Sequence, residues 1–361
     1  MPNKARIRAR AAELRALFEA AGASPVETSL LQPAEVLLDL YGEDIRARAY
    51  MTSDAVRGEQ MLRPDFTVPV VQMHMDHGAE PARYTYAGEV FRRQEDDPDK
   101  PNEYTQVGYE VFDRENPAAA DAEVFAVIRK GLGNLGLRAA TGDIGVLKAA
   151  VSGLSTTERR KDALLRHIWR PRRFRALLDR FSGRSPVPAS RTALLAAADP
   201  MAHDFARIGL RLDSEVAARI EALREDAEAA PISGGEVELI EAILNVREKL
   251  PYALEHLRDI AVDMPAITEA VYCLQDRIAA LQARDVDIET LEFEASYGRT
   301  SMEYYDGFVF GFYAEGRPDL PPVATGGRYD ALTRVLGQGR EIPAVGGVIR
   351  PRLLLELEGA L

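Results

Sequence analysis

A long helical stretch separates two β-rich parts of this chain, and that order narrows the possible folds more than any other pattern. Between about residues 154 and 283 the sequence is rich in Leu, Ala, Arg and Glu. Apolar residues recur there at helical spacing, as in Val237, Ile240, Ile243 and Leu244. Loops with Pro or Gly interrupt the stretch, so we expect an insert made of several short helices.

Short runs with strand character lie on both sides of this helical stretch. Antiparallel strands joined by charged loops explain them better than a series of βαβ units. The expected strands cover residues 49–52, 83–92, 104–112, 291–295 and 308–313. The sequence therefore predicts an α+β fold. Residues 1–150 and 284–361 form one discontinuous domain with a single sheet, and residues 151–283 form the helical insert.

The charge balance limits the classes of partner. The chain carries 45 basic and 57 acidic residues, which gives a formal net charge of −12. A large nucleic-acid footprint would need a basic face, so nucleic-acid binding is not expected. A local basic patch is compatible with this balance.

Cysteine, histidine and hydropathy patterns exclude further classes of protein. Cys273 is the single cysteine, so no internal disulfide is expected and a reducing cytoplasm is the natural compartment. Five histidines without ligand spacing predict no zinc site, and no other metal or cofactor is expected. The basic first residues lead into no apolar signal segment. No window approaches the roughly 18 apolar residues of a membrane span.

A carboxylate and a hydroxyl stand two residues apart, just before an expected helix over residues 70–77. They are Asp65 and Thr67, in the stretch RPDFT. This pair suits the ammonium group of a ligand. Asp and Thr before a helix are also capping residues, so an N-cap is the competing interpretation.

Arg92 stands at the end of an expected strand, followed by Arg93 and an acidic loop. An arginine at a strand end can bind a phosphate or a carboxylate through two parallel hydrogen bonds. The competing interpretation is a solvated surface charge.

Residues 104–111 alternate in the manner of a strand and place Gln106, Gly108 and Glu110 on one face. That face carries an amide and a carboxylate on either side of a glycine. The glycine would leave room for a ligand. The alternative is the polar outer face of an edge strand.

Two short stretches nearer the end of the chain give weaker signals. Tyr304 and Tyr305 precede a strand and could be ordinary aromatic packing. The stretch GGRYD, which begins at Gly326, predicts a turn before a helix, and its Arg328 could serve an anion.

The stretch IPAVGGVIRPRLLLEL covers residues 342–357 and predicts a strand followed by a helix that starts at Pro351. Arg350, Pro351 and Arg352 stand at the junction. A strand that feeds a helix in this way is a common place to hold a nucleotide.

Taken in order, these stretches resemble the catalytic core of histidyl-tRNA synthetase, a class II aminoacyl-tRNA synthetase. LLQPAEVLLDL is similar to motif 1, with Pro33 at its dimer-forming bend. RYTYAGEVFRRQ and EYTQVGYEVF are similar to motif 2, SMEYYDGFVF to the histidine-specific RGLDYY stretch, and GGRYDAL to GGRYDGL. Residues 342–357 fall at motif 3. The resemblance implies an antiparallel sheet flanked by helices, in a homodimer formed through the motif 1 region.

The resemblance also implies a nearly complete amino-acid pocket. In the family an acid, a Thr and a Gln bind the ammonium group, and Asp65, Thr67 and Gln106 match them. A Glu and a Tyr bind the imidazole, and Glu110 and Tyr305 match them. The implied histidine-binding residues are Asp65, Thr67, Arg92, Gln106, Glu110, Tyr304 and Tyr305.

The nucleotide half departs from the family pattern. Adenylation develops charge on the phosphates of ATP, and catalysis needs fixed cations there. The acid of motif 2 is Gln94 here, and the catalytic Arg of RGLDYY falls on Thr300. Arg299 is one residue away, which on a strand would point it to the opposite face. At motif 3, Arg350 replaces the glycine that lets ATP approach.

This combination resembles the regulatory subunits of ATP phosphoribosyltransferase. The anticodon-binding domain of the synthetases is also expected to be absent, since the chain ends soon after motif 3. The resemblance implies a non-catalytic protein without cofactor that joins the short catalytic subunit in a hetero-octamer. It would make that subunit active and sensitive to L-histidine in the first step of histidine biosynthesis.

Two other functions stay open at this point. One is a truncated synthetase-like enzyme that adenylates histidine or another small acceptor. The other is a tRNA- or protein-binding module without a small ligand. The pocket residues themselves could persist as a polar network that only stabilises the fold.

Overall fold

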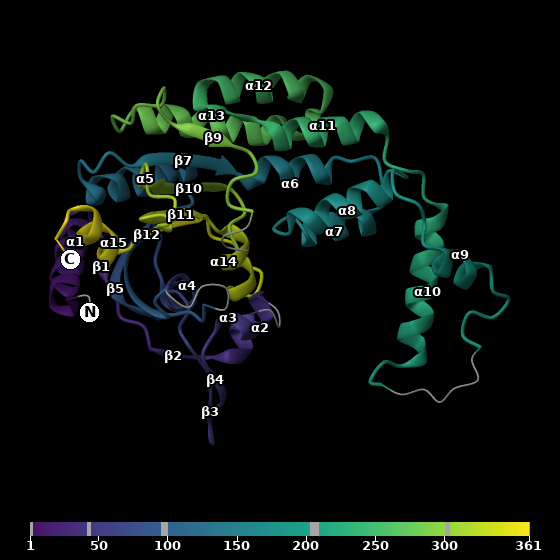
Figure 1. The fold of residues 1–361 in the computed structure, drawn as a ribbon, viewed down its shortest axis with the longest axis horizontal. Coiled ribbons are helices and arrows are strands. Elements are labelled where there is room, and N and C mark those ends of the chain that lie inside the picture. Colours follow the sequence, from purple (N-terminus) through teal and green to yellow (C-terminus); the bar gives the residue numbers. More distant parts are fainter. Residues whose placement is uncertain (1–2, 42–44, 95–99, 203–208, 300–303, 361) are drawn as a thin grey trace.

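A nine-stranded sheet forms the centre of the molecule, as the computed structural model shows for residues 3–41, 45–94, 100–202, 209–299 and 304–360 (Figure 1). The strands, in spatial order, are β1 (Ser24–Pro25), β5 (Ala82–Phe91), β6 (Glu103–Phe112), β12 (Ala344–Ile349), β11 (Ala324–Arg328), β10 (Phe308–Tyr313), β7 (Arg138–Asp143), β9 (Glu292–Glu294) and β8 (Arg247–Lys249). The pairs β1–β5 and β7–β9 are parallel, and the other neighbours are antiparallel. The predicted α+β fold with a largely antiparallel sheet is confirmed.

Helices α1 (Lys4–Ala20) and α5 (Pro117–Leu132) cover one face of this sheet. Helix α5 starts where Asn116 accepts a hydrogen bond from the Ala119 N–H at 3.0 Å, with Pro117 in the first turn. Its Phe125 ring packs against the rings of Phe310 and Phe312, with centroids 5.3 and 5.2 Å away. The strands therefore bury their aromatic side chains under α5.

Smaller elements surround the opposite face. They are the three-stranded sheet β2 (Leu31–Pro33), β4 (Gly58–Leu62) and β3 (Met51–Asp54), and the helices α2 (Ala34–Tyr41), α3 (Ile45–Arg48), α4 (Thr67–His77) and α14 (Asp330–Leu336). Helix α15 (Pro351–Leu357) packs beside α1 instead. The strand expected at residues 49–52 corresponds to β3. The expected strand-to-helix order near the end of the chain is confirmed by β12 and α15.

The middle of the chain is helical. It contains α6 (Ile144–Ser152), α7 (Glu158–Arg166), α8 (Pro171–Phe181), α9 (Ala189–Ala196), α10 (Asp213–Glu228), α11 (Gly234–Asn245), α12 (Leu250–Asp263), the 3₁₀ turn η1 (Pro265–Ile267) and α13 (Thr268–Gln282). Helices α9 and α10 stand away from the sheet (Figure 1). The division into residues 1–150 with 284–361 and residues 151–283 stays a prediction; β8 lies inside the second range and pairs with β9. No helix of the described segments has the length and apolar character needed to cross a membrane.

The expectation of a turn at GGRYD is wrong. Residues Ala324–Arg328 form β11, and only Tyr329 separates this strand from α14. The glycines allow close packing instead: a Cβ at Gly326 would lie 2.3 Å from the Phe310 ring and 2.5 Å from the Gly346 carbonyl oxygen. Arg328 is used inside the protein, not for an anion, as the following contacts show.

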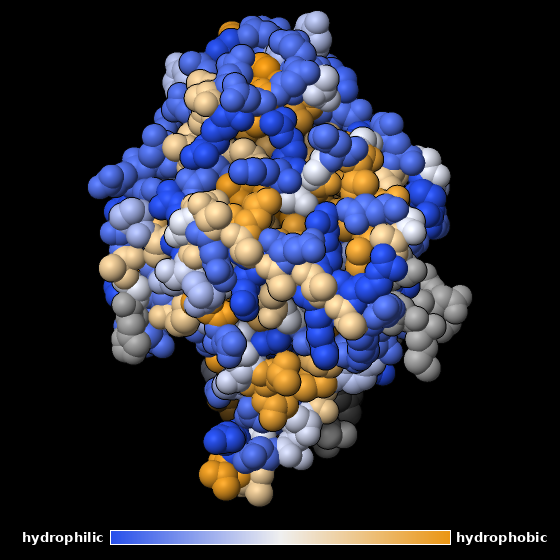
Figure 2. Space-filling model, turned by 90° about the vertical axis from the view of Figure 1, so that its left-hand side faces the viewer, coloured by the Kyte–Doolittle hydropathy of each residue, from blue (hydrophilic) through white to orange (hydrophobic). Residues whose placement is uncertain are grey.

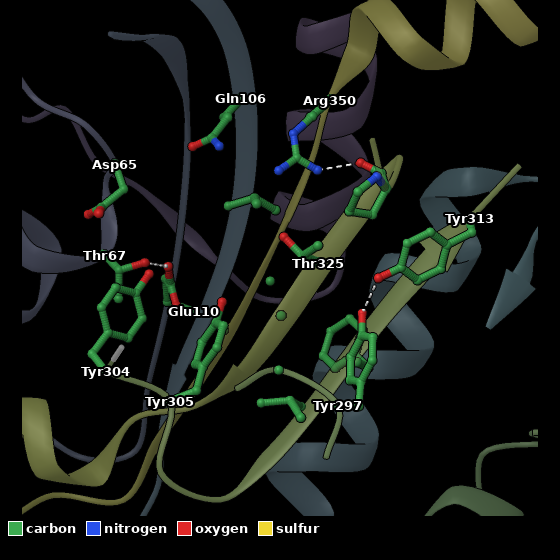
Figure 3. Close-up of a pocket in the computed structure, with 18 of the residues that line it drawn as sticks. Asp65, Thr67, Gln106, Glu110, Tyr297, Tyr304, Tyr305, Tyr313, Thr325 and Arg350 are labelled. Carbon is green, nitrogen blue, oxygen red and sulfur yellow. Dashed lines mark hydrogen bonds between the residues drawn. The ribbon is translucent and has the colours of Figure 1, made fainter. Parts of the chain in front are cut away.

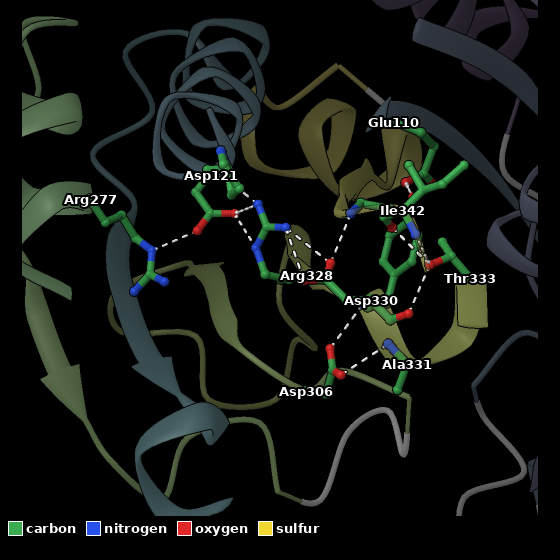
Figure 4. A network of polar contacts seen from close by, with 12 residues as sticks. Glu110, Asp121, Arg277, Asp306, Arg328, Asp330, Ala331, Thr333 and Ile342 are labelled. Atoms are coloured by element: carbon green, nitrogen blue, oxygen red, sulfur yellow. Dashed lines mark hydrogen bonds and ion pairs between the residues drawn. The ribbon is translucent and has the colours of Figure 1, made fainter. Parts of the chain in front are cut away.

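A buried network of ion pairs joins the helical middle to the sheet (Figure 4). Arg277 of α13 donates to Asp121 of α5 and to Asp143 at the end of β7, both at 2.7 Å. Arg328 donates to the other oxygen of Asp121 at 2.7 Å and also pairs with Asp330. Asp121 is only 1% exposed and Arg277 5% exposed. Each charge is therefore offset by a partner across a boundary between elements.

Arg277→Met should destabilise the fold strongly. The substitution keeps the buried aliphatic stem but leaves Asp121 and Asp143 short of a cation, which for a buried pair costs about 3–5 kcal/mol. Urea unfolding followed by circular dichroism measures this. The control is Arg224→Met on α10, whose exposed pair with Glu221 should contribute less than about 1 kcal/mol. A loss at Arg277 as small as that of the control would contradict a structural role for the network.

Candidate functional site

A cavity of about 440 Å³ opens on the sheet face opposite α1 and α5 (Figure 3). The sheet alternation places it there: Tyr109 of β6 donates to Glu123 of α5 at 2.7 Å, so the neighbouring Glu110 points to the other side. All seven residues predicted from the sequence line this cavity: Asp65, Thr67, Arg92, Gln106, Glu110, Tyr304 and Tyr305. They come from three distant parts of the chain, which the sheet brings together.

The alternation predicted for residues 104–111 is confirmed, but the edge-strand interpretation is wrong. Strand β6 lies between β5 and β12, so Gln106 and Glu110 are 2% and 1% exposed. Gly108 also leaves no room for a ligand. The ring of Tyr86 on β5 fills the space, since a Cβ at Gly108 would lie 2.1 Å from it. The glycine therefore serves the packing of Tyr86.

Glu110 is the most enclosed charge of the cavity. Its carboxylate accepts hydrogen bonds from three hydroxyls: Thr67 at 3.1 Å, Tyr86 at 2.8 Å and Tyr329 at 2.6 Å. A carboxylate has about four acceptor positions, so about one remains for a ligand. Burial raises the pKa of Glu110 to about 7 in spite of these donors. Near neutral pH the group can therefore bind a donor as either acid or anion.

Asp65 and Thr67 lie where the chain enters α4. Asp65 accepts a hydrogen bond from the Val68 N–H at 3.3 Å, so it caps the helix start and also lines the cavity. Thr67 uses its hydroxyl for Glu110, and the capping interpretation fails for it. The Gln106 Oε1 atom is buried and accepts no hydrogen bond from any residue that the structure describes. Buried acceptors are rarely left unpaired, so this atom indicates a ligand with a donor.

Two arginines, Arg92 and Arg350, line the cavity, and Arg350 lies on the same side as Gln106 (Figure 3). Arg92 follows β5 and donates through Nε to the Pro64 carbonyl at 2.8 Å. Arg350 stands between β12 and α15 and donates through Nη1 to the Pro322 carbonyl. Burial lowers the pKa of the Arg350 guanidinium. Two guanidinium groups beside an amide suit the carboxylate of a small ligand.

Tyr304 and Tyr305 close the side of the cavity next to β10. Their ring centroids lie 4.9 Å apart, and burial raises the pKa of the Tyr305 phenol. The next residue, Asp306, accepts hydrogen bonds from the N–H groups of Asp330 and Ala331, both at 3.0 Å (Figure 4). The start of α14 thereby holds the end of this segment in place.

Thr300 lies outside the described residues, so its predicted match to the catalytic arginine has no structural counterpart here. Arg299 is not among the lining residues, but it lies in a turn and not on a strand, so strand alternation is not the reason. It is 4% exposed and donates through Nε to the Ile168 carbonyl at 2.7 Å, beside α8. In the described segments no group of three or more His, Cys, Asp or Glu side chains is placed to hold a metal ion.

Several residues of the site escaped the sequence analysis. Tyr86 and Tyr329 hold Glu110, while Tyr297 and Tyr313 share a hydrogen bond of 2.8 Å at the far end of the cavity. The alternation of β5 could have placed Tyr86 on the cavity face. No sequence signal marks Tyr297, because its role depends on how the turn before β10 folds back onto Tyr313 of that strand.

Glu110→Gln should change how stability depends on pH. The pKa of Glu110 rises from 4.5 to about 7 on folding, so the folded state holds a proton that the unfolded state releases. Stability is therefore lost as pH rises from about 4.5 to 7, in total about 3 kcal/mol. The neutral amide lacks this loss.

Urea unfolding at a series of pH values measures the difference between the two proteins. The free energy of unfolding of Glu110→Gln, relative to that of the unaltered protein, should rise across that pH window and then level off. Glu115→Gln, at an exposed position before α5, is the control and should follow the unaltered protein. Parallel profiles for Glu110→Gln and the unaltered protein would show that Glu110 is ionised throughout.

Comparison with known proteins places this geometry in a family. The family model described as histidyl-tRNA synthetase matches residues 1–231 and 216–354. A protein of Agrobacterium fabrum named ATP phosphoribosyltransferase regulatory subunit is 33% identical, over 93% of each chain. A protein of the same name from Brucella anthropi is 30% identical, over 92% of this chain and 93% of its own.

Solved structures show the same fold. A Bacillus halodurans protein described as an ATP phosphoribosyltransferase regulatory subunit/histidyl-tRNA synthetase has a TM-score of 0.69 at 21% identity, covering 98% of this chain and 79% of its own. Histidyl-tRNA synthetase from Nostoc sp. PCC 7120 has a TM-score of 0.66 at 19% identity, covering 99% and 73%. The chain belongs to the histidyl-tRNA synthetase family, among the relatives named ATP phosphoribosyltransferase regulatory subunits.

Proposed function

We propose that this chain is the non-catalytic regulatory subunit of ATP phosphoribosyltransferase, required by the short catalytic subunit for activity and for feedback inhibition by L-histidine. The names of its relatives support the regulatory role. The observation that carries the proposal is the cavity: all seven predicted amino-acid-binding residues line it, while the positions for ATP chemistry are altered.

L-histidine is the ligand that the cavity fits best. Asp65 and the unpaired oxygen of Gln106 suit its ammonium group. Arg92 and Arg350 suit its carboxylate. Glu110 has an acceptor position left for an imidazole N–H. The three parts of one free amino acid thus each have a partner of complementary charge or hydrogen-bonding type.

The residues at the positions that bind ATP in the synthetase family support histidine binding without adenylation. Stabilisation of charge on transferring phosphates needs cations fixed where that charge develops. Gln94 replaces the motif 2 acid, and the Arg350 side chain lies in the cavity where the family pattern has a glycine. Both features count against the alternative of a truncated histidine-adenylating enzyme.

The assembly that we propose is a hetero-octamer with the short catalytic subunit, in the cytoplasm, built on a homodimer through the motif 1 region. Apolar side chains gather at the bottom of the face in Figure 2, where Figure 1 has the three-stranded sheet. Leu30, Leu31 and Val56 are exposed in this part of the chain. An exposed apolar patch beside motif 1 is suited to a contact between two copies.

Activity measurements on the purified chain and the cognate catalytic subunit test the regulatory role. The chain alone should show no histidine-dependent ATP–pyrophosphate exchange above background. Mixing it with the catalytic subunit should give phosphoribosyltransferase activity that histidine inhibits. Clear exchange by the chain alone would favour the adenylating enzyme, and a mixture no more active than the catalytic subunit alone would overturn the proposal.

Asp65→Asn should weaken histidine binding by about 10- to 100-fold, the effect of losing a charge-assisted hydrogen bond of about 1.5–3 kcal/mol. The amide oxygen can still accept from the Val68 N–H, so the helix start is kept. Titration calorimetry measures the affinity. Asp76→Asn, at an exposed position on α4, is the control and should bind as the unaltered protein does. Equal affinity in both variants would place the histidine site elsewhere.

A further inference from the structure

The segment that contains α7 and α8 is strongly basic in an otherwise acidic chain. Residues 158–184 hold ten Arg or Lys against three Asp or Glu, whereas the whole chain has a net charge of −12. The two helices lie between the sheet and the outlying pair α9 and α10 (Figure 1). Such a concentration of positive charge is expected to meet negative charge, either on carboxylates of the same chain or on a partner molecule.

Part of this charge is used inside the fold. Four arginines pair with carboxylates of α10 and α11: Arg159 with Glu225 at 3.4 Å, Arg160 with Asp226 at 2.6 Å, Arg175 with Glu241 at 2.9 Å and Arg184 with Glu241 at 2.6 Å. Two of these arginines lie on α7, one lies on α8 and one follows α8. Their role is to hold α7 and α8 against the neighbouring helices.

The arginines at the turn between α7 and α8 behave differently. Arg166, Arg172 and Arg173 are exposed and form no ion pair with any residue that the structure describes. Arg170 is exposed beside them. Burial lowers the pKa of His167, and the neighbouring charges of Arg170, Arg173 and Arg166 lower it further. We name Arg166, Arg172 and Arg173 the basic corner.

The same turn touches the segment that carries the cavity tyrosines. The Trp169 indole donates to the Tyr305 carbonyl at 3.2 Å. Arg299 donates to the Ile168 carbonyl at 2.7 Å, and its guanidinium lies 4.9 Å from the Phe174 ring centroid. The turn is thus bonded to the chain on both sides of residues 300–303. A ligand in contact with Tyr305 is therefore separated from this turn by one hydrogen bond.

We propose that the basic corner docks an acidic surface of a partner protein, and that occupancy of the cavity alters this docking through the contact between Trp169 and Tyr305. The inference rests on the proposed function, which supplies the partner. Unpaired exposed guanidinium groups repel one another, and a partner's carboxylates relieve that repulsion. Three arginines around one turn match a protein contact better than nucleic acid, because the rest of the chain repels a polyanion.

Charge reversal at the corner tests the docking. The double variant Arg172→Glu with Arg173→Glu should bind the cognate catalytic subunit at least about 10-fold more weakly at physiological salt, with less dependence on salt concentration. The control reverses two exposed basic residues elsewhere, Arg6→Glu with Lys130→Glu, and changes the net charge equally. Affinity is measured by calorimetry, and circular dichroism checks that both variants fold.

The outcomes separate this inference from the proposed function. If the unaltered chain does not bind the catalytic subunit, the proposed function fails. If it binds and the corner variant binds as the control does, the docking inference is wrong. A corner variant that loses affinity for a tRNA mixture but not for the catalytic subunit would make the corner a nucleic-acid contact and would also overturn it.

Trp169→Phe tests the link to the cavity, because it keeps an aromatic ring but removes the N–H that Tyr305 accepts from. Without histidine the variant should bind the catalytic subunit within about twofold of the unaltered protein. Saturating histidine should change the affinity of the unaltered protein by about 5-fold or more, a normal size of coupling between sites, and that of Trp169→Phe by much less. An equal histidine effect in both proteins would refute the link.

Discussion

The buried carboxylate of Glu110 is the interaction on which the arrangement of the site depends. Strand β12 lies next to β6 in the sheet, where Gly346 pairs with Glu110, and a Cβ at Gly346 would lie 1.4 Å from the carboxylate oxygen. Any other residue at Gly346 would displace Glu110 or break the pairing. The hydroxyls of Thr67, Tyr86 and Tyr329 then fix α4, β5 and the start of α14 around one charged group. The positions of these elements and the shape of the cavity are therefore linked.

This dependence explains which parts of the site the sequence could predict. Gln106 and Glu110 follow from the alternation of one strand, and family motifs supply Asp65 and Tyr305. The role of Gly108 was misjudged, because the group that fills the space above it comes from the neighbouring strand. Local pattern gives the direction of a side chain but not the identity of its neighbour across the sheet, which depends on the register of strands far apart in sequence.

The fold shows the same division between local and long-range information. The helical stretch and most strands could be predicted from periodicity and residue type, since each is set within a few residues. The pairing of β6 with β12, and the bonds of Arg277 to Asp121 and Asp143, join segments more than 100 residues apart. Buried charges of this kind favour one arrangement over others, because a displaced partner leaves an unpaired charge in the interior. Only the completed fold reveals which arginine meets which carboxylate.

A binding protein and an enzyme place different demands on this cavity. An enzyme must stabilise charge that develops only in the transition state, whereas a regulator needs only different affinity for its ligand in two states. Arg92 and Arg350 each donate a hydrogen bond to a backbone carbonyl, which fixes their guanidinium groups in place. Such fixed groups are suited to binding a small anionic ligand that does not react. The cavity is lined by residues of α4, β6, β12 and the Tyr304–Tyr305 segment, which lie far apart along the chain. A ligand that contacts all of them favours one arrangement of these elements. The turn between α7 and α8 is hydrogen-bonded to Tyr305 through Trp169 and so belongs to the same arrangement.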